Sequence, residues 1–188
     1  FYNCRIPREL REKPSNLALS GAELFALLCP GVSPEYCAEF CHNLRHHYRK
    51  LNNFARTDLY PGIRVLLERL RQRQSKCYIA SLKPIEPLTK ILKIKGLEQY
   101  FDKWFSPDSF PGRTLTKGEI VRLILAENPA ATNRVLVGDS SSDIIASREN
   151  GLASVGVLYG DGDTDLLLRA RPDFIVEKPE ELIPLLTG

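Results

Sequence analysis

The sequence predicts an α/β protein: a Rossmann-like core with a parallel sheet, preceded by a small all-helical cap domain. Two observations lead to this fold class. After Tyr60-Pro61-Gly62, short β-rich runs alternate with amphipathic helical patterns, and such alternation indicates parallel βαβ units in a doubly wound sheet. Before that point only helical periodicity is found. We therefore expect a cap domain at residues 1–58 and a core domain at residues 59–188.

The cap domain contains two clear helical patterns. An apolar stretch at residues 22–28 follows Ser20-Gly21, and a second helix is expected soon after it. Ser33 is expected to cap this second helix, with Pro34 at its first position. Apolar residues then recur at helical spacing from Tyr36 to Leu51.

The core domain shows four strand patterns and five helical patterns. The expected strands are Lys76–Ser81, Arg134–Asp139, Ser154–Leu158 and Asp173–Val176, and the expected helices are Ile63–Arg73, Glu86–Ile94, Lys117–Glu127, Asp143–Asn150 and Glu180–Leu186. The near-continuous apolarity of 135–137 and 155–158 favours strands that are covered on both faces.

Composition narrows the class of protein. Of 188 residues, 43% are hydrophobic and 26% are charged, which is typical of a globular protein, and the net charge of +3 is too small to indicate nucleic acid as a partner. No apolar run reaches the roughly 18 residues that a membrane helix needs. Five cysteines without framework spacing favour a reduced, cytoplasmic setting over a disulfide scaffold.

Cysteines and histidines gather on the second cap helix, where Cys37 and Cys41, or His42 and His46, share a face, with His47 nearby. A soft-metal site is conceivable there. Apart from two isolated cysteines, no second pair of ligands is found elsewhere in the sequence. We therefore favour buried free cysteines and histidines on the polar face.

Polar residues close the expected strands at the edge where parallel sheets bind ligands. Ser81 ends the first strand, and its hydroxyl, with the free backbone N–H groups that begin at Leu82, suits a phosphate oxygen. The alternative is a plain helix cap, which Ser81 taken alone would favour. Ser81 is interpreted as a phosphate-binding residue only in combination with Lys117, Asp139 and Asp143.

Asp139 and Asp143 form an acid pair at the end of the second expected strand. Two carboxylates at a strand end and helix start can hold Mg²⁺, which prefers oxygen ligands. The alternative is that Asp143 only caps the helix and Asp139 is a loop acid. The buried strand and Gly138, which lets the backbone approach closely, favour the metal site.

Lys117 opens a helix, where a cation is poorly placed because the helix N-terminus is positive. An acidic partner or a phosphate would explain it. A solvated surface lysine remains an alternative, and Arg113 in the same loop competes for the role.

These residues, in this order, resemble motifs II, III and IV of the haloacid dehalogenase-like superfamily, in its phosphoglycolate-phosphatase-like branch. The motifs here are Ile79-Ala80-Ser81-Leu82-Lys83-Pro84, Thr116-Lys117-Gly118-Glu119 and Val137-Gly138-Asp139-Ser140-Ser141-Ser142-Asp143-Ile144. The resemblance covers residues 60–177, and residues 1–58 fit a cap inserted after the first strand.

The resemblance implies a two-step phosphoryl transfer through an aspartyl-phosphate, with a second Asp as acid and base. It also implies that Ser81 and the Leu82 backbone bind phosphoryl oxygens and that Lys117 neutralises charge. Asp139 would ligate Mg²⁺, and Asp143 would support the metal or its waters. The cap would close the site and select the substrate.

Motif I, a strand ending in Asp-x-Asp-Gly-Thr, is absent. The nearest string, Asp161–Asp165, has no apolar run ending at its first Asp, and we reject it as the nucleophile. Either a βα segment precedes residue 1, as the absence of Met also suggests, or the protein is a degenerate, inactive homologue. In the family the missing strand lies between those ending at Ser81 and Asp139, whose inner edges would otherwise be unpaired. We expect the complete protein to have it; direct pairing of those two strands would contradict this.

The expected activity is that of a Mg²⁺-dependent phosphatase acting on a small phosphorylated metabolite, with phosphoglycolate as the family's default substrate. A phosphosugar mutase uses the same motifs and stays open. A metal-free dehalogenase is disfavoured by the acid pair Asp139 and Asp143. From another class, an inactive binding or regulatory module stays open if the nucleophile is truly absent.

Overall fold

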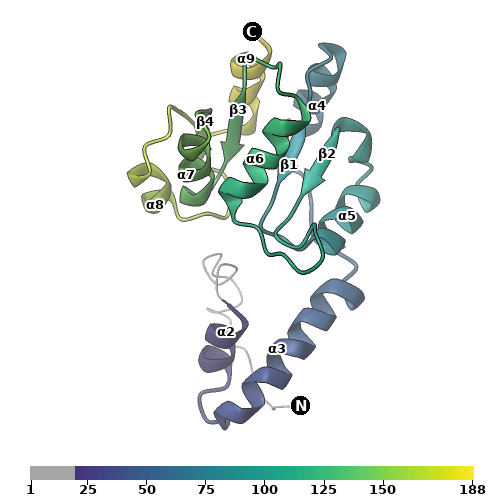
Figure 1. Cartoon of the computed structure of the whole chain (residues 1–188), viewed down its shortest axis with the longest axis vertical. Coiled ribbons are helices and arrows are strands. Elements are labelled where there is room, and N and C mark those ends of the chain that lie inside the picture. The colour runs from purple at the N-terminus through teal and green to yellow at the C-terminus, as the bar shows by residue number, and fades with distance from the viewer. Residues whose placement is uncertain (1–19) are drawn as a thin grey trace. The chain divides into compact units, whose positions relative to one another are not determined.

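The computed structural model describes residues 20–188, which form two compact units (Figure 1). The first unit ends at Asn53 and the second runs from Phe54 to Gly188. The sequence had placed the boundary after residue 58. The helical expectation for residues 1–19 lies outside the described residues. No helix within residues 20–188 has the length and apolarity that a membrane crossing requires.

The first unit is helical, as expected. Helix α2, Gly21–Leu28, begins with a capping box in which the Ser20 hydroxyl accepts from the backbone N–H of Glu23 and the Glu23 carboxylate accepts from that of Ser20. Phe25 is buried in this helix, and its ring lies 5.4 Å from that of Phe40. Ring packing therefore joins the two helices of this unit.

The second helix of this unit starts later than the sequence predicts. Ser33 occupies the N-cap position and Pro34 the first helical position, as predicted, but the Ser33 side chain makes no capping hydrogen bond. The residues after it form a 3-10 turn, Pro34–Tyr36, which leads into α3, Cys37–His46, and then a π-helical turn, His47–Leu51. Proline at the start of the turn fixes its backbone for a helical entry but donates no hydrogen bond.

The second unit holds five parallel strands in two sheets. They are β1 Tyr78–Ala80, β2 Lys103–Phe105, β3 Val135–Gly138, β4 Ala153–Val157 and β5 Phe174–Val176. One sheet has the order β1-β2 and the other β3-β4-β5. In register, Ile79 pairs with Trp104, and Gly138 pairs with Gly156. Within the described chain β1 and β3 are not paired with each other.

Helices cover both faces of these sheets (Figure 1). The helices are α4 Ile63–Gln72, α5 Ile85–Ile94, α6 Lys117–Glu127, α7 Ser141–Glu149, α8 Thr164–Arg169 and α9 Leu182–Thr187. On one side of the sheets, α4 packs against α5 and α9. On the other side, α6 and α7 contact each other, α6 contacts β1, and α7 contacts β3. The crossovers β1-α5-β2 and β3-α7-β4 thus run on opposite sides. The space between β1 and β3 is the topological switch point, where doubly wound folds bind ligands.

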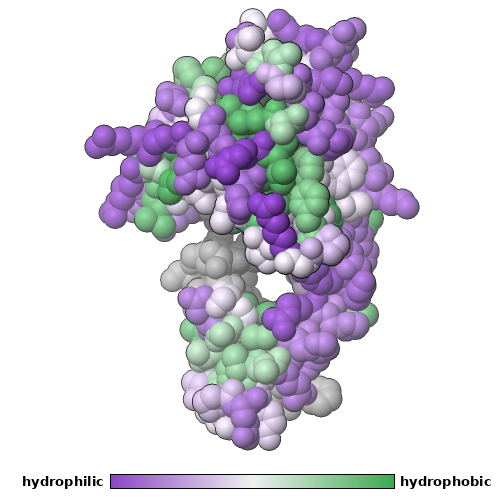
Figure 2. Space-filling view, viewed as in Figure 1, coloured by the Kyte–Doolittle hydropathy of each residue, from purple (hydrophilic) through white to green (hydrophobic). Residues whose placement is uncertain are grey.

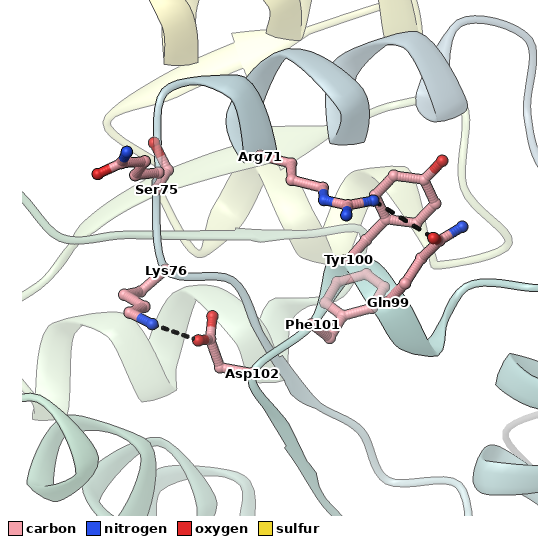
Figure 3. Close-up of a pocket in the computed structure, with 8 residues that line it drawn as sticks. Arg71, Ser75, Lys76, Gln99, Tyr100, Phe101 and Asp102 are labelled. Atoms are coloured by element: carbon pink, nitrogen blue, oxygen red, sulfur yellow. Dashed lines mark hydrogen bonds and ion pairs between the residues drawn. The ribbon is translucent and has the colours of Figure 1, made fainter.

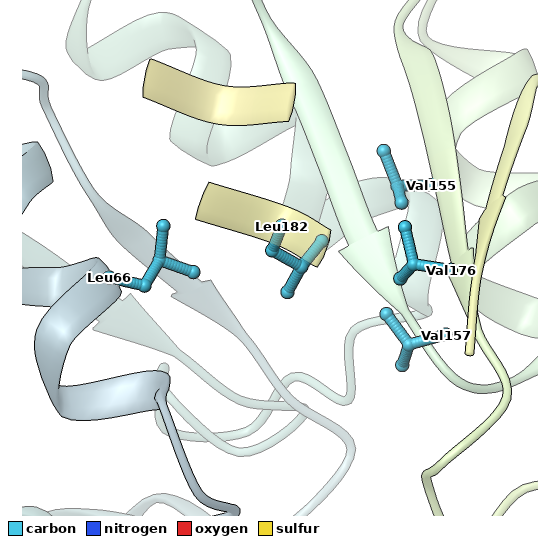
Figure 4. Packing of buried hydrophobic residues seen from close by; sticks show 5 residues of the cluster. All are labelled: Leu66, Val155, Val157, Val176 and Leu182. Atoms are coloured by element: carbon cyan, nitrogen blue, oxygen red, sulfur yellow. The ribbon is translucent and has the colours of Figure 1, made fainter. Parts of the chain in front are cut away.

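Helix α4 supplies neighbouring leucines to two separate cores. Leu66 joins Val155, Val157, Val176 and Leu182 (Figure 4). Leu67 instead joins a second cluster with Leu88, Leu92 and Leu97. One helix therefore connects the β3-β4-β5 half of the unit to the β1-β2 half.

Three features of this unit differ from the expectation. Strand β2 was missed, because its three residues include a charged lysine and fall below the length of a recognisable pattern. Helix α8 was also missed, because its six residues are too few to show a period. Val135 in β3 is 41% exposed, so the prediction that residues 135–137 are covered on both faces is wrong at this position.

Candidate functional site

Lys117 connects the two halves of the sheet at their carboxyl ends. Its Nζ atom donates a hydrogen bond to the carbonyl oxygen of Ala80, the last residue of β1, at 2.6 Å. The same atom lies 2.8 Å from Oδ1 of Asp143 in the first turn of α7. The side chains of Lys117 and Asp143 are only 13% and 8% exposed. The expectation of an acidic partner for Lys117 is met, and a solvated surface lysine is excluded.

The N-terminus of α6, which carries Lys117, is held by a second capping box. The Thr116 hydroxyl accepts from the backbone N–H of Glu119, and the Glu119 carboxylate accepts from that of Thr116. Arg113 donates to the same carboxylate at 2.9 Å. The backbone N–H of Thr116, followed by Arg113, lowers the pKa of Glu119 to about 2. Arg113 is thus engaged with Glu119, so Lys117 is the cation of this loop that reaches the strand ends.

Asp143 is held on both oxygens. While Oδ1 pairs with Lys117, Oδ2 accepts from the backbone N–H of Ser140 at 3.1 Å and from its hydroxyl at 2.7 Å. A Cβ on Gly138 would lie 2.2 Å from Cγ of Asp143, so only glycine fits at the end of β3. The backbone approach that the sequence suggested for Gly138 serves to seat this carboxylate.

Ser81 follows Ala80 directly, so it lies at the same strand end that Lys117 contacts. Its Oγ accepts from the backbone N–H of Lys83 at 3.1 Å. The plain helix cap is not what the structure shows, because Oδ1 of Asp108 accepts from Ile85 N at the start of α5 instead. Leu82 is 54% exposed beside it. This corner therefore presents a hydroxyl and backbone groups to solvent.

Asp139 ends β3 at the same rim. Its Oδ2 accepts a hydrogen bond from the backbone N–H of Gly162 at 3.0 Å, and within residues 20–188 its Oδ1 has no hydrogen-bond partner. A carboxylate oxygen left available in this way suits Mg²⁺, which takes oxygen ligands. The donor set therefore fits the metal that the motifs imply: Asp139 has an available carboxylate oxygen, whereas Asp143 is already engaged by Lys117.

Two tyrosines near Asp139, Tyr60 and Tyr159, were given no role from the sequence. The rings of Tyr60 and Tyr159 meet edge to face, with centroids 5.0 Å apart. Burial, and then proximity to Tyr60, Asp139 and Glu180, raises the pKa of Tyr159 to about 12. Burial also raises the pKa of Tyr60, helped by Asp161 and Asp139. The sequence signal available was Tyr60 beside Pro61-Gly62 at the start of the core.

A pocket of about 440 Å³ lies at the opposite ends of the strands (Figure 3). It is flanked by Lys76 and Asp102, which precede β1 and β2 and form an ion pair of 2.7 Å. Arg71 donates to Gln99 at 3.3 Å across its other side. The ion pair and the hydrogen bond engage charged side chains of the pocket, and none of the predicted site residues lines it.

In the first unit, the sulfur atoms of Cys37 and Cys41 lie 4.0 Å apart, both half-buried, while His42, His46 and His47 are exposed. No group of three potential metal ligands occurs among the residues that the structure describes. Histidines on the polar face agree with the favoured interpretation, whereas the two cysteines are less buried than it assumed.

The model of the haloacid dehalogenase-like hydrolase family matches residues 28–157 of this chain. The chain belongs to this family. Among curated relatives, the phosphoglycolate phosphatase of Vibrio parahaemolyticus is 27% identical over 89% of this chain and 65% of its own length. That of Aquifex aeolicus is 29% identical over 88% of this chain and 76% of its own. The chain spans 55% to 65% of the length of the four Vibrio relatives.

A solved structure supports the fold. The crystal structure of a candidate phosphatase from Clostridium difficile superimposes with a TM-score of 0.84 at 22% identity, over 96% of this chain and 84% of the other. The family membership and the Rossmann-like fold predicted from the sequence are thus confirmed. The resemblance to the phosphoglycolate-phosphatase-like branch is confirmed as well.

Proposed function

We propose that the complete protein is a Mg²⁺-dependent phosphatase that hydrolyses a small phosphate monoester. One observation carries the proposal: a single ammonium group contacts the end of β1 and the start of α7, at 2.6 Å and 2.8 Å. This contact brings together three motifs that are far apart in the chain. A largely buried lysine at a switch point, beside the Ser81 hydroxyl and a carboxylate, suits a phosphoryl group and its cation.

Each residue then has a distinct role. Ser81 and the backbone N–H of Leu82 hold phosphoryl oxygens, and Lys117 offsets the negative charge that gathers in the transition state. Asp139 offers Oδ1 to Mg²⁺, which when bound would neutralise charge on the phosphate. Asp143 orients Lys117 through their ion pair and, near the metal, supports its waters.

The nucleophilic aspartate of the family belongs on a strand that pairs with both β1 and β3. Among residues 20–188 no strand pairs with the inner edges of β1 and β3, which supports this assignment, because inner strand edges are costly to leave open. Both strands are only partly buried, and Val135 is 41% exposed, although their sequences are apolar. Figure 2 shows hydrophobic surface exposed beside α6 on the face of the second unit that is in view.

The chemistry proceeds in two balanced steps. The aspartate carboxylate attacks phosphorus, and the alcohol of the substrate departs with a proton from the neighbouring acid. Water then attacks the phosphorus of the aspartyl-phosphate and gives a proton back to the same neighbouring group, so that the aspartate carboxylate leaves unchanged and inorganic phosphate is the product. The relatives named phosphoglycolate phosphatase suggest phosphoglycolate as the first substrate to try.

The test uses the intact protein that contains this chain. Phosphate release from phosphoglycolate and from p-nitrophenyl phosphate is measured with Mg²⁺ and with EDTA. We expect turnover only with Mg²⁺, and a loss of about 100-fold or more in kcat for Lys117→Met and Asp139→Asn. Lys103→Met, which removes a cation that is paired with Glu127 on the surface, should keep full activity.

The outcomes separate the alternatives. No turnover from the folded, Mg²⁺-supplied protein would contradict a phosphatase and favour an inactive binding module. Isomerisation of a phosphosugar without net phosphate release would favour a mutase. Wild-type activity in Asp139→Asn would remove Asp139 from the metal role.

A further inference from the structure

The loop between β4 and α8 is anchored at both ends and lies against Asp139. At its start the backbone N–H of Leu158 donates to the carbonyl oxygen of Val176 at 2.9 Å. At its end Oδ1 of Asp163 accepts from the backbone N–H of Leu166 at 2.9 Å and caps α8. Because both ends are fixed, the position of the residues between them, 159–162, is strongly constrained.

Two glycines in this loop are required by space. A Cβ on Gly162 would lie 2.0 Å from the carbonyl oxygen of Asp139, and one on Gly160 would lie 2.3 Å from Cβ of Asp139. Neither glycine is among those with a positive φ, so neither is needed for a left-handed backbone. The loop therefore lies in close contact with both the backbone and the side chain of Asp139.

The loop forms a hydrogen bond with only one of the two carboxylate oxygens of Asp139. The backbone N–H of Gly162 occupies Oδ2 at 3.0 Å, and Oδ1 has no such partner within the described chain. A carboxylate with one oxygen fixed by a hydrogen bond cannot rotate without losing that bond. Outer hydrogen bonds of this kind orient the ligands of metal sites.

We propose that loop 159–162 is a positioning element for the cation: it holds Asp139 so that Oδ1 alone faces the metal. This inference rests on the proposed function, because it takes Asp139 as the Mg²⁺ ligand. Gly162 is its positioning residue and acts through Asp139, and Gly160 supplies the room for the loop to approach. A loop that only connected β4 to α8 would need neither the bond nor the two close approaches.

The first test measures Mg²⁺ binding by calorimetry in the intact protein, without substrate. Gly162→Ala and Gly160→Ala should each weaken Mg²⁺ binding by about tenfold or more. The control is Gly31→Ala, since a Cβ there meets nothing within 4 Å and the residue has no positive φ. Both loop variants binding Mg²⁺ as tightly as the control would overturn the inference.

The kinetic readout should separate positioning from general damage. For the loop variants, the Mg²⁺ concentration for half-maximal activity should rise, and kcat at saturating Mg²⁺ should recover most of its value. A fall in kcat that no amount of Mg²⁺ restores would contradict a role in orienting the ligand.

The second test needs no metal and no substitution of either loop glycine. Amide hydrogen exchange of Gly162 in the wild-type protein should be slow, and Asp139→Ala should accelerate it at least tenfold. The matched control Asp161→Ala, in the same loop, should leave it slow, because no hydrogen bond joins Asp161 to this amide. Fast exchange in the wild type would overturn the inference even if the alanine variants fail to fold. A protected amide in a wild-type protein that binds no Mg²⁺ would support the contact and overturn the proposed function.

Discussion

Replacing Lys117 by methionine should destabilise the second unit by about 3 kcal/mol. Removal of one partner from a buried ion pair typically costs about 3–5 kcal/mol, because a charge is left without compensation. The exposures of 13% and 8% place this pair in that class. Asp143 keeps its two hydrogen bonds from Ser140, which reduces the cost, whereas the carbonyl of Ala80 loses its donor, which adds to it.

The assay is urea denaturation followed by the fluorescence of Trp104, the single tryptophan of the chain. This residue lies in β2 and its Nε1 donates to Thr89 at 2.9 Å, so it reports on the second unit. The control is Lys103→Met, which breaks an ion pair with Glu127 whose side chains are 54% and 31% exposed. That variant should lose no more than about 1 kcal/mol.

A double-mutant cycle adds a sharper criterion. Asp143→Asn removes the charge that Lys117→Met leaves unpaired, so the double variant should be more stable than the sum of the two single losses predicts, by about 1–3 kcal/mol. If Lys117→Met costs no more than Lys103→Met, or if the two losses simply add, the pair does not connect the sheet halves as the distances indicate.

The remaining predictions concern the helix that carries Lys117 and the two cores. The pKa of Glu119 is about 2 in the folded protein and higher when unfolded, so its stabilisation is present above about pH 4.5 and lost as pH falls toward 2. Glu119→Gln should flatten the pH dependence of unfolding by urea over that range, and an unchanged slope would contradict the capping role. Leu66→Ala and Leu67→Ala should each cost about 2–5 kcal/mol in the same assay. Val65→Ala on the exposed side of α4 should cost under about 1 kcal/mol, and equal losses at all three positions would contradict the two-core arrangement.

The sequence predicted best what depends on local periodicity. Helix α6 was expected at Lys117–Glu127 and is found there, because its apolar residues recur regularly and a capping box fixes its start. Asp139 was expected at a strand end because a continuous apolar run precedes it. These strand ends were sufficient to nominate the site, since parallel strands gather their carboxyl ends at one edge.

What the sequence missed depends on contacts between distant segments. The partner of Lys117 follows from the packing of α6 on α7, and Asn150 contributes by donating to the carbonyl of Gly118 at 3.2 Å. The position of Lys117 at the start of a helix indicated that it needs an acidic partner. It did not indicate that this partner is Asp143. The approach of Gly160 and Gly162 to Asp139 likewise depends on the fold, because the loop and the end of β3 are more than twenty residues apart in the chain.

The capped start of α6 has a consequence for ligand binding. Its capping box, the Arg113 contact to Glu119 and the hydrogen bond from Asn150 to the carbonyl oxygen of Gly118 all exist before any ligand arrives. Little conformational entropy then remains to be lost at Lys117 when an anion binds. Substrate binding should therefore leave the amides of this helix end almost unchanged in nuclear magnetic resonance spectra, with the larger shifts in the segments that flank it.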